Sequence, residues 1–219
     1  MKLILDLFNS NKKINSVLIL MCVYAVSLLI IRAKITQSIF LFFLMWNLFL
    51  GLIPYFLMLY LKMNDNYTKS KIKMYATTVI WLAFLPNSFY IVTDLVHLSL
   101  SHASTFWYDL TIISSFAFIG FFLGIQSIFL FEKIIVNNFH KKIQIIIVPA
   151  VCLLSGFGIY LGRILRYNSW NIISHPVKLF SDIGTQLTTY NSMLFSLHFG
   201  ILIYLFYTSK KLILTIKSN

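Results

Sequence analysis

Long apolar runs, separated by short polar segments, dominate this chain, and six of the runs are long enough to cross a membrane. We therefore predict an all-α membrane protein with six transmembrane helices, at about residues 14–31, 37–61, 69–85, 107–131, 143–165 and 190–207. No internal repeat or low-complexity linker divides the chain, so we expect a single membrane domain, residues 1–219.

A proline interrupts this pattern after the third run, within the stretch LPNSFYIVTDLVHL. Pro86 removes a helical hydrogen bond and disfavours helix at the residue before it. The segment from Phe89 to Leu100 reaches only about 18 Å as an α-helix, against a hydrocarbon core of about 30 Å. We therefore predict that the third helix ends at Leu85. A short interfacial or re-entrant helix should follow it at the outer face, capped by Asn87 or Ser88.

The polar residues of this stretch fall on one stripe of such a helix, because they are three or four positions apart: Asn87, Tyr90, Asp94, His97 and Ser101. Asp94 and His97 are one turn apart and can meet. Three interpretations of the pair compete: half of a metal site, an acid–base pair in which Asp94 orients His97, or a structural pair. No second pair of metal ligands is visible, so we predict no metal site. Ionisable groups are costly within a membrane, which favours a functional role for at least one of the two.

A second polar cluster, GRILRYNSWN, occupies residues 162–171 at the end of the fifth run. Arg163 and Arg166 are one turn apart, and they either anchor the helix at the interface or clamp a phosphate or carboxylate. Both clusters belong to the same predicted membrane face, so we expect Asp94 within salt-bridge reach of one arginine. The result is an outward-facing polar pocket, with catalytic residues Asp94 and His97 and substrate-binding residues Asn87, Tyr90, Arg163, Arg166 and Asn168.

Four other features accompany these clusters. Residues 176–187 form an amphipathic pattern, which predicts a helix that covers the site as a lid or rests on the lipid surface. His198, in the sixth run, is expected to bond a backbone carbonyl or a serine rather than to ligate haem. Asn47 is expected to join helices by hydrogen bonding, and the GxxxG motifs at residues 120–124 and 158–162 to pack helices closely.

Composition supports a membrane protein. The chain is 59% hydrophobic and 11% charged, whereas about a quarter of the residues in a soluble domain are charged. The net charge of +12 does not indicate nucleic acid, because the basic residues lie between the apolar runs and form no basic domain. Cys22 and Cys152 lie inside apolar runs and are expected to be buried thiols.

The distribution of Lys and Arg predicts the orientation. If the N-terminus is inside, thirteen of the 18 Lys and Arg residues fall on inner segments. The five outer ones are Arg32, Lys34, Arg163, Arg166 and Lys178. We therefore predict that both termini are cytoplasmic. The inner charges are all lysines, whereas three of the outer five are arginines, whose planar fork suits the recognition of anions.

Two segments, WLAFLPNSFYIVTDLVHL and GIYLGRILRYNSW, resemble the signature segments of an uncharacterised bacterial membrane family, domain-of-unknown-function family 1361. The resemblance covers nearly the whole chain. It implies a location in a bacterial cytoplasmic membrane. It implies no activity, cofactor or substrate.

Three functions are compatible with these patterns. The leading hypothesis is an enzyme or a binding protein for an anionic lipid or a lipid-linked headgroup, because paired arginines and an acid–base pair share one face. The alternative is a non-catalytic membrane assembly or scaffold subunit whose polar cluster is structural. A small-molecule transporter comes third, because no repeat is visible. The lipid bilayer is the expected partner in each case, and nucleic acid in none.

Overall fold

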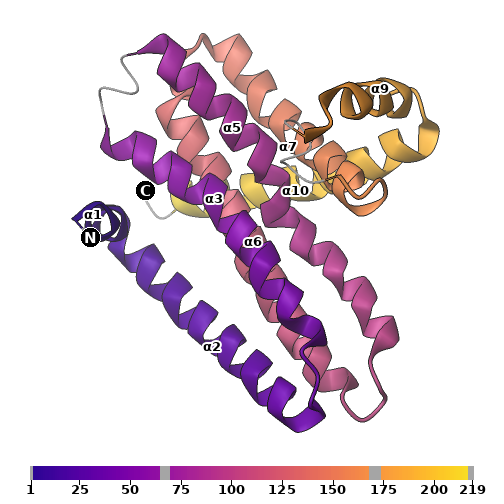
Figure 1. Ribbon diagram of the computed structural model, residues 1–219. Coiled ribbons are helices and arrows are strands. Elements are labelled where there is room, and N and C mark those ends of the chain that lie inside the picture. The colour runs from indigo at the N-terminus through magenta and orange to yellow at the C-terminus, as the bar shows by residue number, and fades with distance from the viewer. Residues whose placement is uncertain (1, 65–69, 168–173, 217–219) are drawn as a thin grey trace.

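The computed structural model describes residues 2–64, 70–167 and 174–216, and all regular structure within these ranges is helical (Figure 1). Six helical segments are long and apolar enough to cross a membrane. The predicted fold class is therefore confirmed: the protein is a multi-pass α-helical membrane protein. The elements are α1 (Lys2–Ser10), α2 (Lys12–Thr36), η1 (Phe40–Phe42), α3 (Phe43–Met63), α5 (Lys71–Tyr90), η2 (Ile91–Leu100), α6 (Phe106–Ile134), η3 (Val136–Asn138), α7 (Lys141–Arg163), α9 (Pro176–Gln186) and α10 (Tyr190–Ile216).

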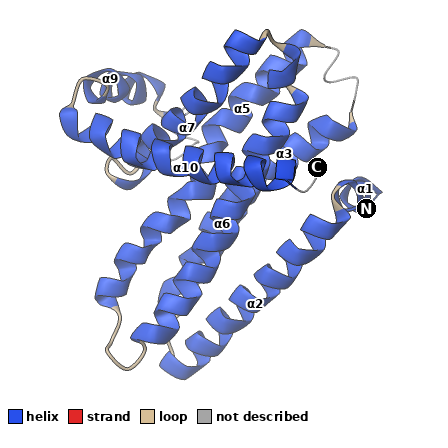
Figure 2. Cartoon of the chain, turned by 180° about the vertical axis from the view of Figure 1, so that it is seen from behind, coloured by secondary structure: helices blue, strands red, loops and turns tan. Residues whose placement is uncertain are grey.

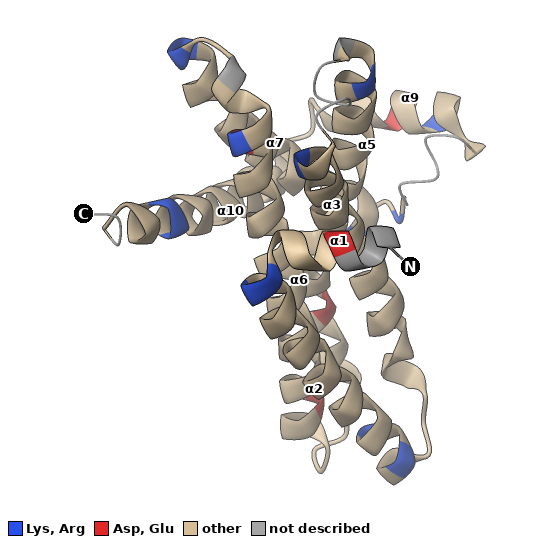
Figure 3. Cartoon of the chain, turned by 90° about the vertical axis from the view of Figure 1, so that its left-hand side faces the viewer, with Lys and Arg blue, Asp and Glu red and all other residues tan. Residues whose placement is uncertain are grey.

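The helix α10 crosses the long helices of the molecule instead of running alongside them (Figure 2). Its most extensive contact is with α7. The two helices approach closely because glycine, which has no side chain, stands at two contact points. A methyl group at Gly156 would collide with the Ser196 carbonyl, and one at Gly200 would crowd the Leu153 backbone. Lys and Arg residues lie mostly near helix ends, as expected for helices whose middle lies in hydrocarbon (Figure 3).

The prediction that Pro86 ends the third helix is wrong. Helix α5 passes through Pro86 to Tyr90, and the 3-10 helix η2 continues it to Leu100 without a break. Asn87 and Ser88 therefore lie inside a helix and cap nothing, and the separate interfacial or re-entrant helix is not confirmed. Membrane helices tolerate proline where neighbouring helices enclose the irregular turn.

Glycines of α7 provide part of that enclosure. A methyl group at Gly158 would overlap the Pro86 ring, and one at Gly162 would lie 3.3 Å from the Tyr90 ring. The predicted packing face of the GxxxG motif in α7 is therefore confirmed, and its partner is the proline turn of α5. This contact places Arg163, the next residue, beside η2.

The GxxxG motif of α6 packs against α5 as well, on the turn that follows Pro86. A methyl group at Gly120 would lie 2.7 Å from the Ser88 carbonyl oxygen, and Gly124 faces the Phe89 ring. The Ser88 hydroxyl donates a 2.7 Å hydrogen bond to the Gly51 carbonyl of α3. Three helices thus hold residues 86–91 in a helical path, which outweighs the local preference of proline to break it.

Two short amphipathic helices flank the spans. The sequence pattern did not reveal α1, which is too short to form an apolar run; the buried Asn15 amide caps it by donating to the carbonyls of Leu7 and Phe8. The second, α9, agrees with the predicted helix at residues 176–187, and its Leu179 is buried.

Candidate functional site

The centre of the candidate site is an ion pair between η2 and α7. Asp94 is buried, and its Oδ1 lies 3.1 Å from Arg163 Nη1. Asn47 of α3 donates a 2.8 Å hydrogen bond to the other carboxylate oxygen. The predicted contact between Asp94 and one of the two arginines is confirmed, with Arg163 as the partner. Asn47 joins helices as expected, but sequence reasoning had not placed it in the site.

Arg163 uses its fork of donors on protein groups. Nη1 also donates to the Tyr90 hydroxyl at 3.2 Å, and Nη2 donates to the Thr93 carbonyl at 2.9 Å. The guanidinium lies over the Tyr90 ring, 5.6 Å from its centroid. A cation in the last turn of α7 also stabilises the negative end of the helix dipole. Arg163 therefore fastens the end of α7 to the junction of α5 and η2.

His97 shares a face with Asp94 because η2 is a 3-10 helix with three residues per turn. Its Nε2 lies 3.9 Å from Asp94 Oδ1, which is within ion-pair range but too long for a hydrogen bond. The imidazole packs edge-on against Phe43 and Phe40, with ring centroids 4.9 and 5.9 Å apart. Asp94 thus does not orient His97 directly, and the catalytic roles predicted for the two stay predictions.

The remaining predicted residues have different surroundings. Arg166 is exposed, adopts a left-handed backbone with φ of 59°, and makes no ion pair with any residue that the structure describes. Asn87 donates to the Phe84 carbonyl at 3.1 Å. Asn168 lies outside the described residues. Ser101, predicted to extend the stripe, follows the end of η2 in an extended conformation and donates to Asp109 instead.

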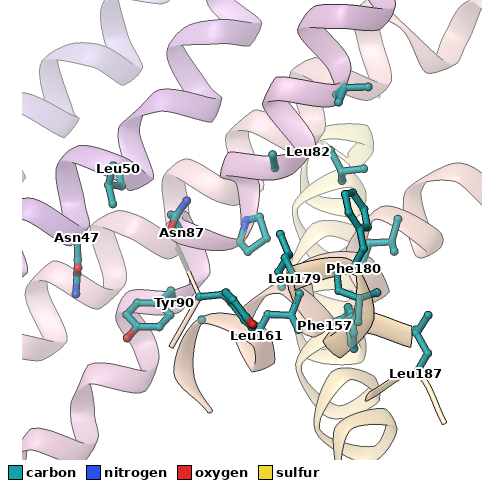
Figure 4. Close-up of a pocket in the computed structure, with 18 of the residues that line it drawn as sticks. Asn47, Leu50, Leu82, Asn87, Tyr90, Phe157, Leu161, Leu179, Phe180 and Leu187 are labelled. Atoms are coloured by element: carbon teal, nitrogen blue, oxygen red, sulfur yellow. The ribbon is translucent and has the colours of Figure 1, made fainter. Parts of the chain in front are cut away.

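A largely apolar groove of about 540 Å³ adjoins the ion pair (Figure 4). Helices α3, α5, α7 and α9 form its walls, mainly through aliphatic and aromatic side chains. Asn47, Asn87 and Tyr90 lie toward one side of the groove, and Phe180 and Leu187 toward the other. Asn47 and Tyr90 also bind Asp94 and Arg163, so the groove and the ion pair form one continuous site.

Helix α9 closes one side of the groove. It contributes Leu179, Phe180 and Ile183 to the lining, which favours the lid interpretation over a helix that only rests on lipid. Tyr167 donates a 2.6 Å hydrogen bond to Asp182 of α9. This hydrogen bond, with smaller contributions from burial and the carboxylate charge, raises the pKa of Tyr167, so the phenol stays protonated as a donor.

A second buried ion pair was not predicted. Arg32 of α2 contacts Asp109 of α6 in two places, Nε to Oδ1 at 2.9 Å and Nη2 to Oδ2 at 3.3 Å. Ser101 donates to the same carboxylate at 2.8 Å, and Arg32 donates to the Ser38 carbonyl at 3.3 Å. The only sequence signal was an acidic residue, Asp109, inside an apolar run. None of these four residues lines the groove.

The remaining predictions concern His198, the two cysteines and metal ligands. His198 Nδ1 lies 2.7 Å from the Leu194 carbonyl oxygen, as expected. Both cysteines are free thiols, with Cys152 buried and Cys22 half-buried. Across the described parts of the chain, no three His, Cys, Asp or Glu side chains gather into a possible metal-ligand group.

Comparison with known proteins gives one match. Residues 46–206 match the model of a family described as "Protein of unknown function (DUF1361)". No curated protein and no solved structure matches the chain. The matched range holds both signature segments, the whole groove and the Asp94–Arg163 pair, whereas Arg32 lies outside it. Because well over half of the chain is matched, it belongs to the DUF1361 family.

Proposed function

We propose that this protein binds an anionic lipid or lipid-linked headgroup, with the hydrocarbon in the groove and the headgroup at its polar end. One observation carries the proposal: Asn47 and Tyr90 line the apolar groove and also belong to the hydrogen-bond network of the ion pair. Apolar walls with a few convergent polar groups are typical of a site for an amphiphilic ligand.

The charges around the polar end favour an anion. Arg163 lies at the polar end, where it binds Tyr90 and Asp94, and Arg166 follows it three residues later in the chain. Asp94 already engages Arg163, so we assign the headgroup contact to the exposed Arg166, which directly precedes the groove-lining Tyr167. An arginine is suited to a phosphate because its fork can donate two parallel hydrogen bonds.

Binding fits this geometry better than catalysis. A general base works within about 2.6–3.2 Å of the group that it serves, and Asp94 is 3.9 Å from His97. We therefore propose that Asp94 and Arg163 hold the shape of the polar end, and that Asn87, Tyr90 and Arg166 contact the headgroup. Such binding requires no movement of the ion pair.

Native mass spectrometry of the purified protein tests the headgroup assignment. We expect retention of lysophosphatidylglycerol, which is anionic, over lysophosphatidylcholine, which has no net charge. Arg166→Ala should reduce retention of the anionic lipid at least about tenfold, since a charge-assisted hydrogen bond is lost. The matched control is Lys34→Ala, another exposed cation, on α2 away from the groove. Equal retention of the two lipids would contradict the proposal.

Filling the groove distinguishes lipid binding from the scaffold alternative. Ala83→Trp places a large ring among the groove walls, whereas Ile80→Trp adds the same ring on the same helix outside the lining. We expect the first variant to lose the anionic lysolipid and the second to keep it. If both keep it, the groove binds no lipid and the scaffold alternative is favoured. Thermal unfolding of each variant verifies that it is folded.

We also propose that both termini are cytoplasmic and that the membrane is the bacterial cytoplasmic membrane. The uneven distribution of Lys and Arg supports the orientation. Two exposed loop histidines allow a matched test in a background without Cys22 and Cys152. An impermeant thiol reagent should label His102→Cys in intact cells and should label His140→Cys only after lysis. The reverse pattern would overturn the orientation.

A further inference from the structure

The size of the groove limits what it can hold. At about 540 Å³, the groove lies within the range of about 300–1,000 Å³ that is typical of pockets for one small-molecule ligand. A single hydrocarbon chain is a ligand of that size. A phospholipid with two such chains needs twice the volume. Resting on the proposed function, we infer that the ligand is an anionic phosphate carried on a single hydrocarbon chain.

The length of the groove agrees with one chain in a single pass. Along α5 the lining extends over the twelve residues from Val79 to Tyr90, which rise by about 16 Å in an α-helix. Half of a hydrocarbon core is about 15 Å thick. A chain with its headgroup beside Tyr90 therefore fills the groove once, and no length remains for a second chain in series.

Helix α9 excludes a second chain on one side of the groove. Helix α9 closes the groove with the buried Leu179, and two hydrogen bonds fasten it: Tyr167 to Asp182 at 2.6 Å and Tyr160 to Gln186 at 3.0 Å. The two chains of a phospholipid leave the same glycerol, so the second chain would begin beside the first. On this side it could enter only by displacing α9 and breaking these hydrogen bonds.

Two classes of lipid share the required chemistry. A lysophospholipid carries a phosphodiester on one acyl chain, and a polyprenyl phosphate carries a phosphate monoester on one isoprenoid chain. Both present anionic oxygens to Arg166 and an apolar chain to the groove. The polar end offers them the uncharged side chains of Asn87 and Tyr90 as well.

The test compares three lipids with the full-length protein in native mass spectrometry: lysophosphatidylglycerol, phosphatidylglycerol and a polyprenyl phosphate. The first two share a headgroup and differ in chain number. We expect at least one single-chain lipid to be retained about tenfold more than phosphatidylglycerol, and the better retained one identifies the class. Ala83→Trp should abolish this preference, and Val79→Trp, at the exposed rim of the groove, should weaken it without disturbing the core.

The outcomes separate this inference from the proposed function. Retention of phosphatidylglycerol equal to that of both single-chain lipids, with loss of all of them in Ala83→Trp, overturns the single-chain inference and leaves the proposed function standing. Retention of every lipid unchanged by Ala83→Trp means that binding lies outside the groove, which overturns both. A preference for a single chain that Ala83→Trp abolishes and Ile80→Trp preserves supports both.

Discussion

The two arginine–aspartate pairs of this protein have the same chemistry and different surroundings. The Arg32–Asp109 contact is bidentate, and the side chains are 9% and 1% exposed. The Asp94–Arg163 contact is monodentate, and the Arg163 side chain is 19% exposed. The first pair is completed by serine, threonine and backbone groups, whereas the second is completed by two residues that also line a groove.

The comparison shows why a buried ion pair does not by itself identify a functional site. Arg32–Asp109 joins α2 to the start of α6, and all its contacts serve to hold the ends of helices together. Asp94–Arg163 also joins helices, but its partners Asn47 and Tyr90 form the wall of a cavity. The continuity with an adjoining cavity, more than the charges, distinguishes the candidate site.

The largest expected effect is on the structural pair. Asp109→Asn leaves the Arg32 guanidinium buried without a counter-charge, which costs about 3–5 kcal/mol of the free energy of unfolding. The measurement is thermal or denaturant unfolding in detergent. Lipid retention per folded molecule should stay normal. A loss of retention in molecules that remain folded would break the distinction between the two pairs.

Arg163→Lys should have a smaller effect on stability. Lysine keeps the charge beside Asp94 but cannot also reach the Tyr90 hydroxyl and the Thr93 carbonyl, since it lacks the planar fork. The expected loss is about 1.5–3 kcal/mol of unfolding free energy, the range for hydrogen bonds to charged groups. Lys178→Arg, on the exposed face of α9, is the control and should unfold as the wild type does.

Each aspartate also accepts a hydrogen bond from an uncharged side chain. Ser101 donates to Asp109, and Asn47 donates to Asp94, each at 2.8 Å. Replacing either by Ala should reduce the unfolding free energy by about 1–2 kcal/mol, as one hydrogen bond is lost. Only Asn47→Ala should also alter retention of lysophosphatidylglycerol, because Asn47 lines the groove. Equal retention by both variants would place Asp94 and its partners among purely structural groups.

The smallest effect on stability is expected for Arg166→Lys. Arg166 is exposed and has no ion-pair partner within the described ranges, so the variant should unfold at the wild-type temperature. Retention of the anionic lysolipid should still fall, because a lysine cannot form the two parallel hydrogen bonds of a guanidinium. Unchanged retention would mean that Arg166 supplies charge alone.

Much of the site followed from the sequence because a membrane limits the choices. Apolar runs define the spans, and the order of the spans places Asp94 and Arg163 on the same face of the membrane. Their contact is predicted from this shared face. The Arg32–Asp109 pair could not be found in this way. Its partners are 77 residues apart, and each resembles an ordinary residue at the end of a span.

The order of residues is enough to predict the six apolar helices and the pairing of Asp94 with an arginine, since span length and the cost of burying charge act locally along the chain. The helical path through Pro86 depends on packing between distant segments, because glycine contacts from α6 and α7 overcome the preference of proline to break a helix. The position of α9 over a groove between α3, α5 and α7 depends on the same packing. A cavity is what remains between packed side chains of distant segments, so no local pattern encodes it.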